Sequence, residues 1–177
     1  MVTMKQAPVC TAPATHTTIE SRLGDLTVVA QDGAVTGLYF PHHWYLPDLA
    51  SFGDRNDTGF DDIRDQLSDY LAGARRHFDV PVHAQGDEFQ ERVWDLLTRI
   101  PYGETVTYGE LARDLGDATT AQQVGAAVGR NPACILIPCH RVVGTGGKLT
   151  GYAGGLRRKR FLLDTERDVA RPPSRLF

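Results

Sequence analysis

Residues 107–129 read TYGELARDLGDATTAQQVGAAVG, and this stretch decides the fold of the C-terminal half. It holds two pairs with capping-box spacing, Thr107 with Glu110 and Thr120 with Gln123, in which side chains satisfy the free N–H groups at a helix start. The pattern predicts two short helices joined by a four-residue link, which is helix-turn-helix spacing. Many helical hairpins that do not touch DNA share this spacing, so DNA binding needs support from elsewhere in the chain.

The next stretch carries a candidate nucleophile. The continuous apolar run 134–137 predicts a short buried strand, and Pro138-Cys139-His140-Arg141 follow it directly. Cationic neighbours favour the thiolate form of a cysteine, which is the reactive form. Adjacent residues of a strand or helix do not face each other, so a working Cys139–His140 pair needs a turn or a water relay, and Pro138 favours the turn. The alternative is that Cys139 is an inert buried cysteine.

The remaining sequence predicts two structural units. In the first, three short strands form an antiparallel meander, followed by a loop, a helix and a further short strand: 17–20, 26–30, 35–40, 48–58, about 60–76, and 78–83. In the second, the helix-turn-helix is flanked by a helix, a two-stranded ribbon and a final helix: 89–100, 142–143 with 148–152, and 156–166. The predicted boundaries are a flexible tail 1–14, an N-terminal domain 15–85, a C-terminal domain 86–170 and a tail 171–177.

Composition limits the class of protein. The chain has 177 residues, of which 41% are hydrophobic and 23% charged, enough for a packed core without metal or disulfide staples. Its three cysteines show no framework spacing, and no apolar run approaches the roughly 18 residues of a membrane span. We therefore expect a cytoplasmic protein with reduced thiols and no membrane partner.

Charge is distributed unevenly along the chain. The net charge is −3, but residues 1–85 carry 6 basic against 11 acidic side chains, whereas residues 86–177 carry 13 against 11. Four basic residues stand in a row at 157–160. The C-terminal half is thus the candidate for contact with an anionic partner, and the alternative for the basic run is a solvated helix face.

Several segments of the C-terminal half resemble the O6-alkylguanine-DNA alkyltransferases, also called methylated-DNA-protein-cysteine methyltransferases. The resemblance covers about residues 86–166 and is weaker upstream. Its segments are PYGET 101–105, TY 107–108, NP 131–132, IPCHRVV 137–143, GYAGG 151–155, LL 162–163 and Glu166. It implies an α/β protein with an N-terminal ribonuclease-H-like domain and a C-terminal helix-turn-helix, winged-helix-like domain. It also implies a monomer that binds double-stranded DNA through the minor groove and flips out the damaged base.

The reaction that the resemblance implies is irreversible, stoichiometric transfer of an alkyl group to a cysteine, from O6-alkylguanine and as a further candidate from O4-alkylthymine. Carried over by position, Cys139 is the acceptor, His140 takes its proton through a water, Glu166 orients the imidazole and Asn131 orders the turn. The substrate-binding residues would be Tyr108, Val142, Gly151, Tyr152, Ala153 and Gly154. The DNA-binding residues would be Thr107, Ala121, Gln122, Gln123, Arg130 and Arg141. No cofactor and no metal are implied.

Two positions depart from the family pattern. Gln122 stands where the family usually has an arginine that fills the space left by the flipped base, and Ala153 stands where some members carry serine. Two other functions remain as alternatives: an alkylated-base-binding protein without chemistry, which Cys139 argues against, and a thiol hydrolase using Cys139 and His140. The segment 144–148, GTGGK, lacks the residues of a phosphate-binding loop, and Cys10 and the histidines at 16, 42 and 43 lack metal-finger spacing.

Overall fold

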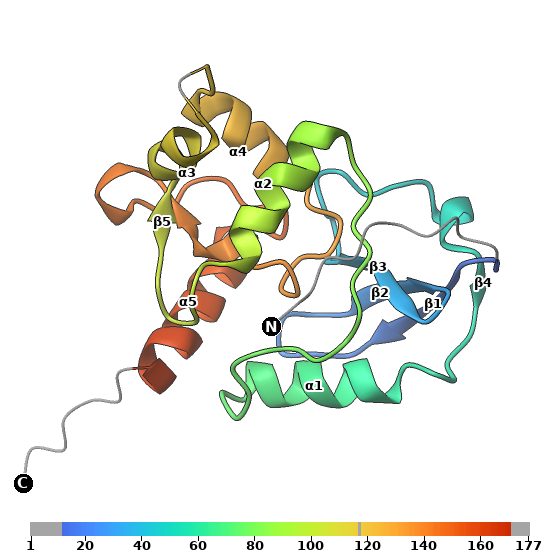
Figure 1. Cartoon of the computed structure of the whole chain (residues 1–177). Helices are drawn as coiled ribbons and strands as arrows, with labels where there is room; N and C mark the ends of the chain where they lie inside the picture. Colours follow the sequence, from blue (N-terminus) through green and yellow to red (C-terminus); the bar gives the residue numbers. More distant parts are fainter. Residues whose placement is uncertain (1–11, 117, 171–177) are drawn as a thin grey trace, which may run out of the picture.

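Two units lie side by side in the computed structural model, which describes residues 12–116 and 118–170 (Figure 1). A small sheet with one helix makes up the N-terminal unit, and helices dominate the C-terminal unit. The predicted α/β class with a C-terminal helix-turn-helix unit is therefore confirmed. Cys10 and the predicted tails, apart from residues 12–14, lie outside the described residues.

The N-terminal sheet has the strand order β3-β2-β1-β4. The predicted meander of three antiparallel strands is present, and the Asp32–Gly33 turn between β2 and β3 has positive φ at both residues, as a tight hairpin requires. The predicted loop 48–58 contains a short 3-10 helix and a strand parallel to β1. The elements are β1 (Thr15–Ile19), β2 (Leu26–Gln31), β3 (Ala34–Tyr39), the 3-10 helix Leu49–Phe52 and β4 (Asp54–Arg55).

Helix α1 (Asp61–Leu71) packs on this sheet through buried side chains that recur with helical spacing, including Ile63, Leu67 and Tyr70. It ends earlier than the predicted position near residue 76, because the chain turns at Gly73, which has φ +76°. The predicted strand 78–83 is reduced to a single parallel bridge to β3.

The C-terminal unit forms both predicted capping boxes. Thr107 Oγ1 accepts from the Glu110 backbone N–H at 3.1 Å, and Thr120 Oγ1 accepts from the Gln123 N–H at 3.2 Å. The elements are α2 (Glu88–Thr98), β5 (Val106–Thr107), α3 (Tyr108–Leu115), α4 (Ala121–Gly129), the 3-10 helix Cys139–Arg141, β6 (Val142–Val143), the 3-10 turn Thr145–Gly147 and α5 (Leu156–Ala170).

Two predictions for this unit are wrong. The apolar run 134–137 forms a buried turn instead of a strand, because the Ile137 N–H bonds back to the Ala133 carbonyl at 2.9 Å. Residues 148–152 form no ribbon with β6, since the chain coils into a 3-10 turn after Gly144. Strand β6 pairs in parallel with β5 instead, joining the start of the helix-turn-helix to the end of the Cys139 turn.

The two units share one hydrophobic core, and the sheet supports the segment that carries the candidate nucleophile. The Leu38 N–H of β3 donates to the Pro132 carbonyl at 2.8 Å, and the Cys134 N–H donates to the Leu38 carbonyl at 3.3 Å. The N-terminal unit therefore fixes the backbone five residues before Cys139. Among the described residues, no helix combines the length and apolar character needed to cross a bilayer.

Candidate active site

Cys139 opens a one-turn 3-10 helix directly after Pro138, so the predicted turn is present. The Asn131 side chain holds the loop before Cys139 through both of its polar atoms. Its Nδ2 donates to the Ile137 carbonyl at 2.9 Å, and its Oδ1 accepts from the Ala133 N–H at 3.0 Å. Between these anchors Ile135 has φ +74°, a left-handed conformation that is costly for a β-branched residue. The loop that presents Cys139 is thus held in a strained, fully buried form.

The Cys139 thiol is buried next to a second thiol, that of Cys134, with 3.7 Å between the sulfur atoms. A hydrogen bond from Cys134 lowers the pKa of Cys139, burial opposes this, and Asn131 and the charge of Lys159 lower it further. The pKa of Cys134 is raised well above its usual value by the same hydrogen bond and by burial. The proton is therefore kept on Cys134, and Cys139 is the more acidic thiol of the pair.

Lys159 supplies a buried positive charge at the site. From the sequence it was only one of the four basic residues at 157–160. Its Nζ donates to the carbonyls of Thr150 and Gly151 at 2.9 and 3.3 Å, and its side chain is excluded from solvent. Burial lowers the pKa of Lys159 to about 8, and the negative charge of Cys139 acts in the opposite direction. At neutral pH most molecules therefore hold an ammonium group near the thiol and tied to the loop after β6.

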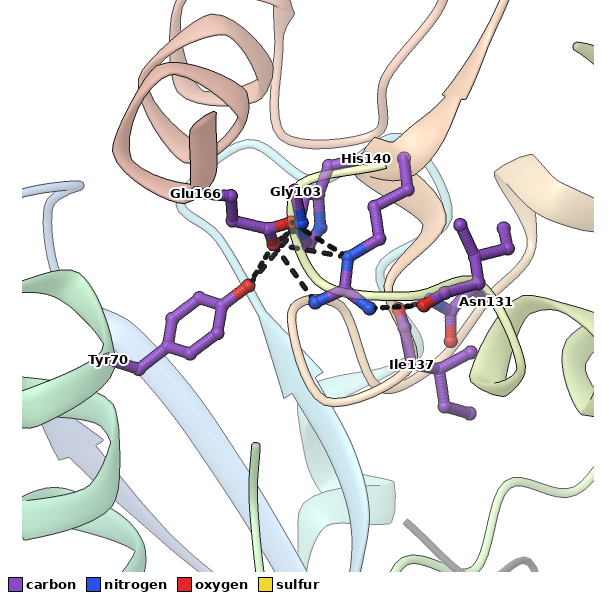
Figure 2. A network of polar contacts seen from close by, with 8 residues as sticks. Tyr70, Gly103, Asn131, Ile137, His140 and Glu166 are labelled. Atoms are coloured by element: carbon purple, nitrogen blue, oxygen red, sulfur yellow. Dashed lines mark hydrogen bonds and ion pairs between the residues drawn. The ribbon is translucent and has the colours of Figure 1, made fainter. Parts of the chain in front are cut away.

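His140 is oriented by a carboxylate from the last helix, as Figure 2 shows. Its Nε2 lies 2.6 Å from Glu166 Oε1, and both side chains are fully buried. A carboxylate accepts hydrogen bonds, so Nε2 carries the proton and Nδ1 keeps its lone pair. Within the described residues Nδ1 is buried with no hydrogen-bond partner, which leaves it able to accept a proton. Burial lowers the pKa of His140, although Glu166 opposes the shift, so the imidazole is neutral at pH 7.

Glu166 is the centre of the polar network in Figure 2. Besides His140, it accepts from the Tyr70 hydroxyl, from the Arg141 guanidinium at 2.9 to 3.2 Å and from the Gly103 N–H at 2.9 Å. Burial alone would raise the pKa of Glu166, but His140 and Arg141 hold it well below its usual value. Glu166 is thus a buried anion at neutral pH.

Arg141, predicted to contact DNA, is bonded inside the protein. Its guanidinium is buried, bonded to Glu166 and donating to the Ile100 carbonyl at 2.7 Å. Because those donors are used inside the protein, the structure gives Arg141 a role in holding Glu166, and its contact with DNA stays a prediction.

Tyr70 is a site residue that the sequence did not reveal. It lies on α1 of the N-terminal unit, and its hydroxyl donates to Glu166 and lies 3.3 Å from His140 Nε2. Burial and the charge of Glu166 raise the pKa of Tyr70 well above its usual value, so it stays a donor. The sequence placed it only as an inward position of a helix, and no local pattern links positions 70 and 166.

Cys139 lines a cavity of about 50 Å³. Four predicted substrate-binding residues line it, together with Trp44 of the N-terminal unit, which was not predicted. The lining is Trp44, Tyr108, Gly125, Val128, Gly129, Cys139, Gly151, Tyr152 and Ala153.

Val142 and Gly154, predicted to bind substrate, lie outside this lining. Val142 is buried in β6, paired with Val106. Gly154 packs against the ring of Phe40, where an added Cβ would come within 2.4 Å. Both residues therefore pack inside the protein.

The predicted DNA-binding side chains on α4 are exposed. Ala121, Gln122 and Gln123 stand in the first turn of α4, but the Gln123 Oε1 caps the helix by accepting from the Thr120 N–H at 2.8 Å. Among the described polar side chains of this turn, Gln122 is therefore the one left to extend from the helix. Arg130 lies beyond the end of α4 with its guanidinium 4.6 Å from the Tyr45 ring centre, and Thr107 caps α3.

The basic run at the start of α5 is only half exposed. Arg158 donates to the Leu23 carbonyl at 2.6 Å and Lys159 is buried, whereas Arg157 and Arg160 face solvent. In the described ranges, 12–116 and 118–170, no cluster of three His, Cys, Asp or Glu could hold a metal ion.

A helix-turn-helix beside a buried cysteine and a histidine–glutamate pair is the combination expected of a DNA-binding protein that uses a thiol nucleophile. Residues 88–168 match the family model "6-O-methylguanine DNA methyltransferase, DNA binding domain", and residues 15–84 match the model of its ribonuclease-like domain. The chain belongs to the 6-O-methylguanine DNA methyltransferase family.

Individual relatives agree with this assignment. A methylated-DNA–protein-cysteine methyltransferase of Mycobacterium bovis is 44% identical over 163 residues, covering 92% of this chain and 98% of the relative. The crystal structure of Mycobacterium tuberculosis OGT in complex with DNA superposes with a TM-score of 0.83 at 42% identity, covering 88% of this chain and 94% of that one. An O6-methylguanine DNA methyltransferase from Methanococcus jannaschii gives a TM-score of 0.59 at 28% identity, with coverage of 85% and 93%.

Proposed function

We propose that this protein repairs DNA by moving the alkyl group of O6-alkylguanine onto Cys139, once per molecule. The observation that carries the proposal is the position of Cys139, which lines a cavity, lies 3.7 Å from a second thiol that lowers its pKa, and directly precedes His140. Among the described residues, His140 Nδ1 has no hydrogen-bond partner. Binding alone would not need a buried acidic thiol and a charged relay, both of which cost desolvation free energy.

The chemistry follows from this arrangement. The neutral imidazole of His140 takes the thiol proton, through a water, and Glu166 stabilises the imidazolium that forms. The Cys139 thiolate attacks the alkyl carbon, the carbon–oxygen bond breaks, and guanine leaves with negative charge developing at O6. Tyr108 lines the cavity, and burial raises the pKa of its hydroxyl, so the hydroxyl remains a donor for that charge. A thioether is not hydrolysed by water, so the protein is consumed.

The proposed partner is double-stranded DNA, bound by a monomer through the minor groove with α4 facing the bases. Small and polar exposed side chains at the start of α4 support close approach to a groove. Extrusion of the base brings the alkyl group into the cavity, because a nucleotide inside the duplex cannot reach a buried thiol. Two free thiols at the site need a reducing compartment, which supports a cytoplasmic location.

Analysis of the DNA product tests this function. We expect duplex DNA containing O6-methylguanine to be returned to DNA containing guanine, with the yield limited by the amount of protein. Unchanged DNA in a stable complex would instead indicate a binding protein without chemistry. Hydrolysis of a small ester in a parallel incubation, with many turnovers per chain, would indicate a thiol hydrolase.

Gln122 is expected to limit base extrusion. Its amide can hydrogen-bond an orphaned base but has neither a charge to attract phosphates nor a guanidinium plane to stack. We expect Gln122→Arg to tighten duplex binding and to speed transfer from duplex DNA several-fold, with little change on free O6-benzylguanine. Single-turnover rates of Gln122→Arg and Gln122→Ala on both substrates measure this. Rates on duplex that are unchanged in both variants would show that position 122 does not enter the DNA.

Trp44 is expected to limit the size of the alkyl group. Its indole lines the cavity near Gly151, 3.8 Å from where a Cβ would stand, and the cavity is small. We expect Trp44→Ala to raise the rate for O6-benzylguanine in DNA relative to O6-methylguanine. Leu49→Ala, an exposed apolar position in the same connection between β3 and β4, is the matched control and should leave the ratio unchanged. An unchanged ratio in Trp44→Ala would remove Trp44 from the substrate pocket.

A further inference from the structure

Cys134 is not the alkyl acceptor in the transfer proposed above, yet its sulfur lies 3.7 Å from the acceptor sulfur. Both cysteines are free thiols, and both are buried in the same turn. A disulfide has about 2.05 Å between its sulfur atoms. Rotation of the two cysteine side chains would bring the sulfur atoms this close.

The backbone fixes this proximity. Ala133 accepts from the Ile137 N–H at 2.9 Å, and Ile137 in turn accepts from the Cys139 N–H at 2.7 Å. Cys134 and Ile137 also form an isolated bridge, so the chain folds back on itself between the two cysteines. The Asn131 side chain holds the same loop from its start. The two thiols therefore face each other in the folded protein and need no movement of a domain to react.

We propose that Cys134 and Cys139 form a reversible disulfide when a peroxide enters the acceptor cavity. The cavity of about 50 Å³ exceeds the share of one water molecule, about 30 Å³, so a molecule as small as hydrogen peroxide fits beside Cys139.

Two steps balance the reaction. The Cys139 thiolate attacks one peroxide oxygen, the O–O bond breaks, a sulfur–oxygen bond forms, and hydroxide leaves with the electron pair; sulfur is oxidised and the peroxide is reduced. Cys134 sulfur then attacks the sulfenic sulfur, the sulfur–oxygen bond breaks, and the leaving hydroxide takes the Cys134 proton to form water. An external dithiol reduces the disulfide back to two thiols by thiol–disulfide exchange.

The consequence is protection of an acceptor that is used only once. A sulfenic acid without a neighbouring thiol is oxidised further to sulfinic acid, which ordinary thiols do not reduce. With Cys134 in place, the oxidised acceptor is held as a disulfide that cannot accept an alkyl group but can be restored. The sulfur chemistry does not depend on the proposed repair function, because the disulfide can be detected without any DNA.

A peptide mass measurement tests the disulfide directly. The full chain carrying Cys10→Ser, which leaves only the two site thiols, is treated with hydrogen peroxide and alkylated with iodoacetamide. Trypsin cleaves after Arg130 and Arg141, so both cysteines lie in one peptide, 131–141. We expect this peptide to be lighter by two hydrogen atoms than the reduced peptide and to carry no alkylation. Treatment with dithiothreitol before alkylation should restore two alkylated cysteines.

Activity supplies the second readout, with each protein compared with its own untreated rate. We expect peroxide to cause nearly complete loss of methyl transfer in the Cys10→Ser protein and dithiothreitol to restore it. Adding Cys134→Ala or Cys134→Val should make the loss persist after dithiothreitol, with Cys139 found as sulfinic or sulfonic acid. Recovery of Cys134→Ala equal to that of the parent, or a peroxide-treated parent peptide without the disulfide mass, would overturn the proposal.

Discussion

Replacing Cys139 with serine is expected to abolish methyl transfer and to leave DNA binding largely intact. A serine hydroxyl has nearly the shape of the thiol but is a far weaker nucleophile, and the relay around it is not built to ionise an alcohol. The exposed side chains at the start of α4 are unaffected, since Cys139 is buried and lies outside this helix. Transfer is measured with labelled O6-methylguanine duplex, and binding by titration of the same duplex.

Cys134→Ser is the matched control for this variant. It changes the neighbouring buried thiol in the same turn while keeping a hydrogen-bond donor close to Cys139. We expect it to retain methyl transfer. Measurable transfer by Cys139→Ser, or loss of transfer in Cys134→Ser alone, would show that Cys139 is not the acceptor.

Replacing Glu166 with glutamine should have the second-largest effect, on rate and on stability together. The amide cannot stabilise the His140 imidazolium as a carboxylate does, so we expect transfer to slow by roughly 100-fold or more. It also leaves the buried Arg141 guanidinium without its counter-charge, and breaking a buried pair in this way costs about 3 to 5 kcal/mol in the free energy of unfolding. Single-turnover rates and chemical denaturation measure the two effects.

Asp164→Asn is the control on the same helix, because Asp164 is exposed and pairs with Arg167 at the surface. We expect it to change neither property appreciably. If the Glu166→Gln variant remains folded and transfers methyl as fast as the wild type, Glu166 does not assist His140 in the transfer.

The stability effect of Glu166 has a defined pH dependence. The pKa of this carboxyl is depressed in the folded protein, so its contribution is fully present above its unfolded value of about 4.3 and is lost as pH falls toward the folded value. The difference in free energy of unfolding between wild type and Glu166→Gln should therefore be largest above about pH 4.3 and should shrink in more acid solution. A difference that grows on acidification would contradict the assignment of Glu166 as a buried anion.

Local sequence patterns predicted the two capped helices and the turn before Cys139. The two capping boxes predicted helices α3 and α4, because each cap is made within four residues. The Pro138 turn before Cys139 was predicted for the same reason. The buried-strand prediction for 134–137 failed because an apolar run indicates that residues are buried, but not whether the chain is extended or turned. Hydrogen bonds from the Asn131 side chain hold this run in a turn.

The charges of the site could not be inferred from neighbours in the sequence. Arg141 and Lys159 looked like surface cations, but their partners lie on other elements: Glu166 for Arg141, and the carbonyls before Tyr152 for Lys159. Tyr70 and Trp44 reach the site from the N-terminal unit, far from it in sequence. Such contacts follow from the packing of the two units against each other, which no short pattern records.

The proposed repair reaction requires Cys139 to accept one alkyl group from O6-alkylguanine in DNA. The most direct test of this step is the mass of tryptic peptide 131–141, and of the whole chain, after incubation with excess O6-methylguanine duplex. We expect one added methyl group per chain, located on Cys139 by fragmentation, with no further addition at longer times. Methylation of Cys134 or Cys10, more than one methyl group per chain, or repair of the DNA without a mass change in the protein would contradict it.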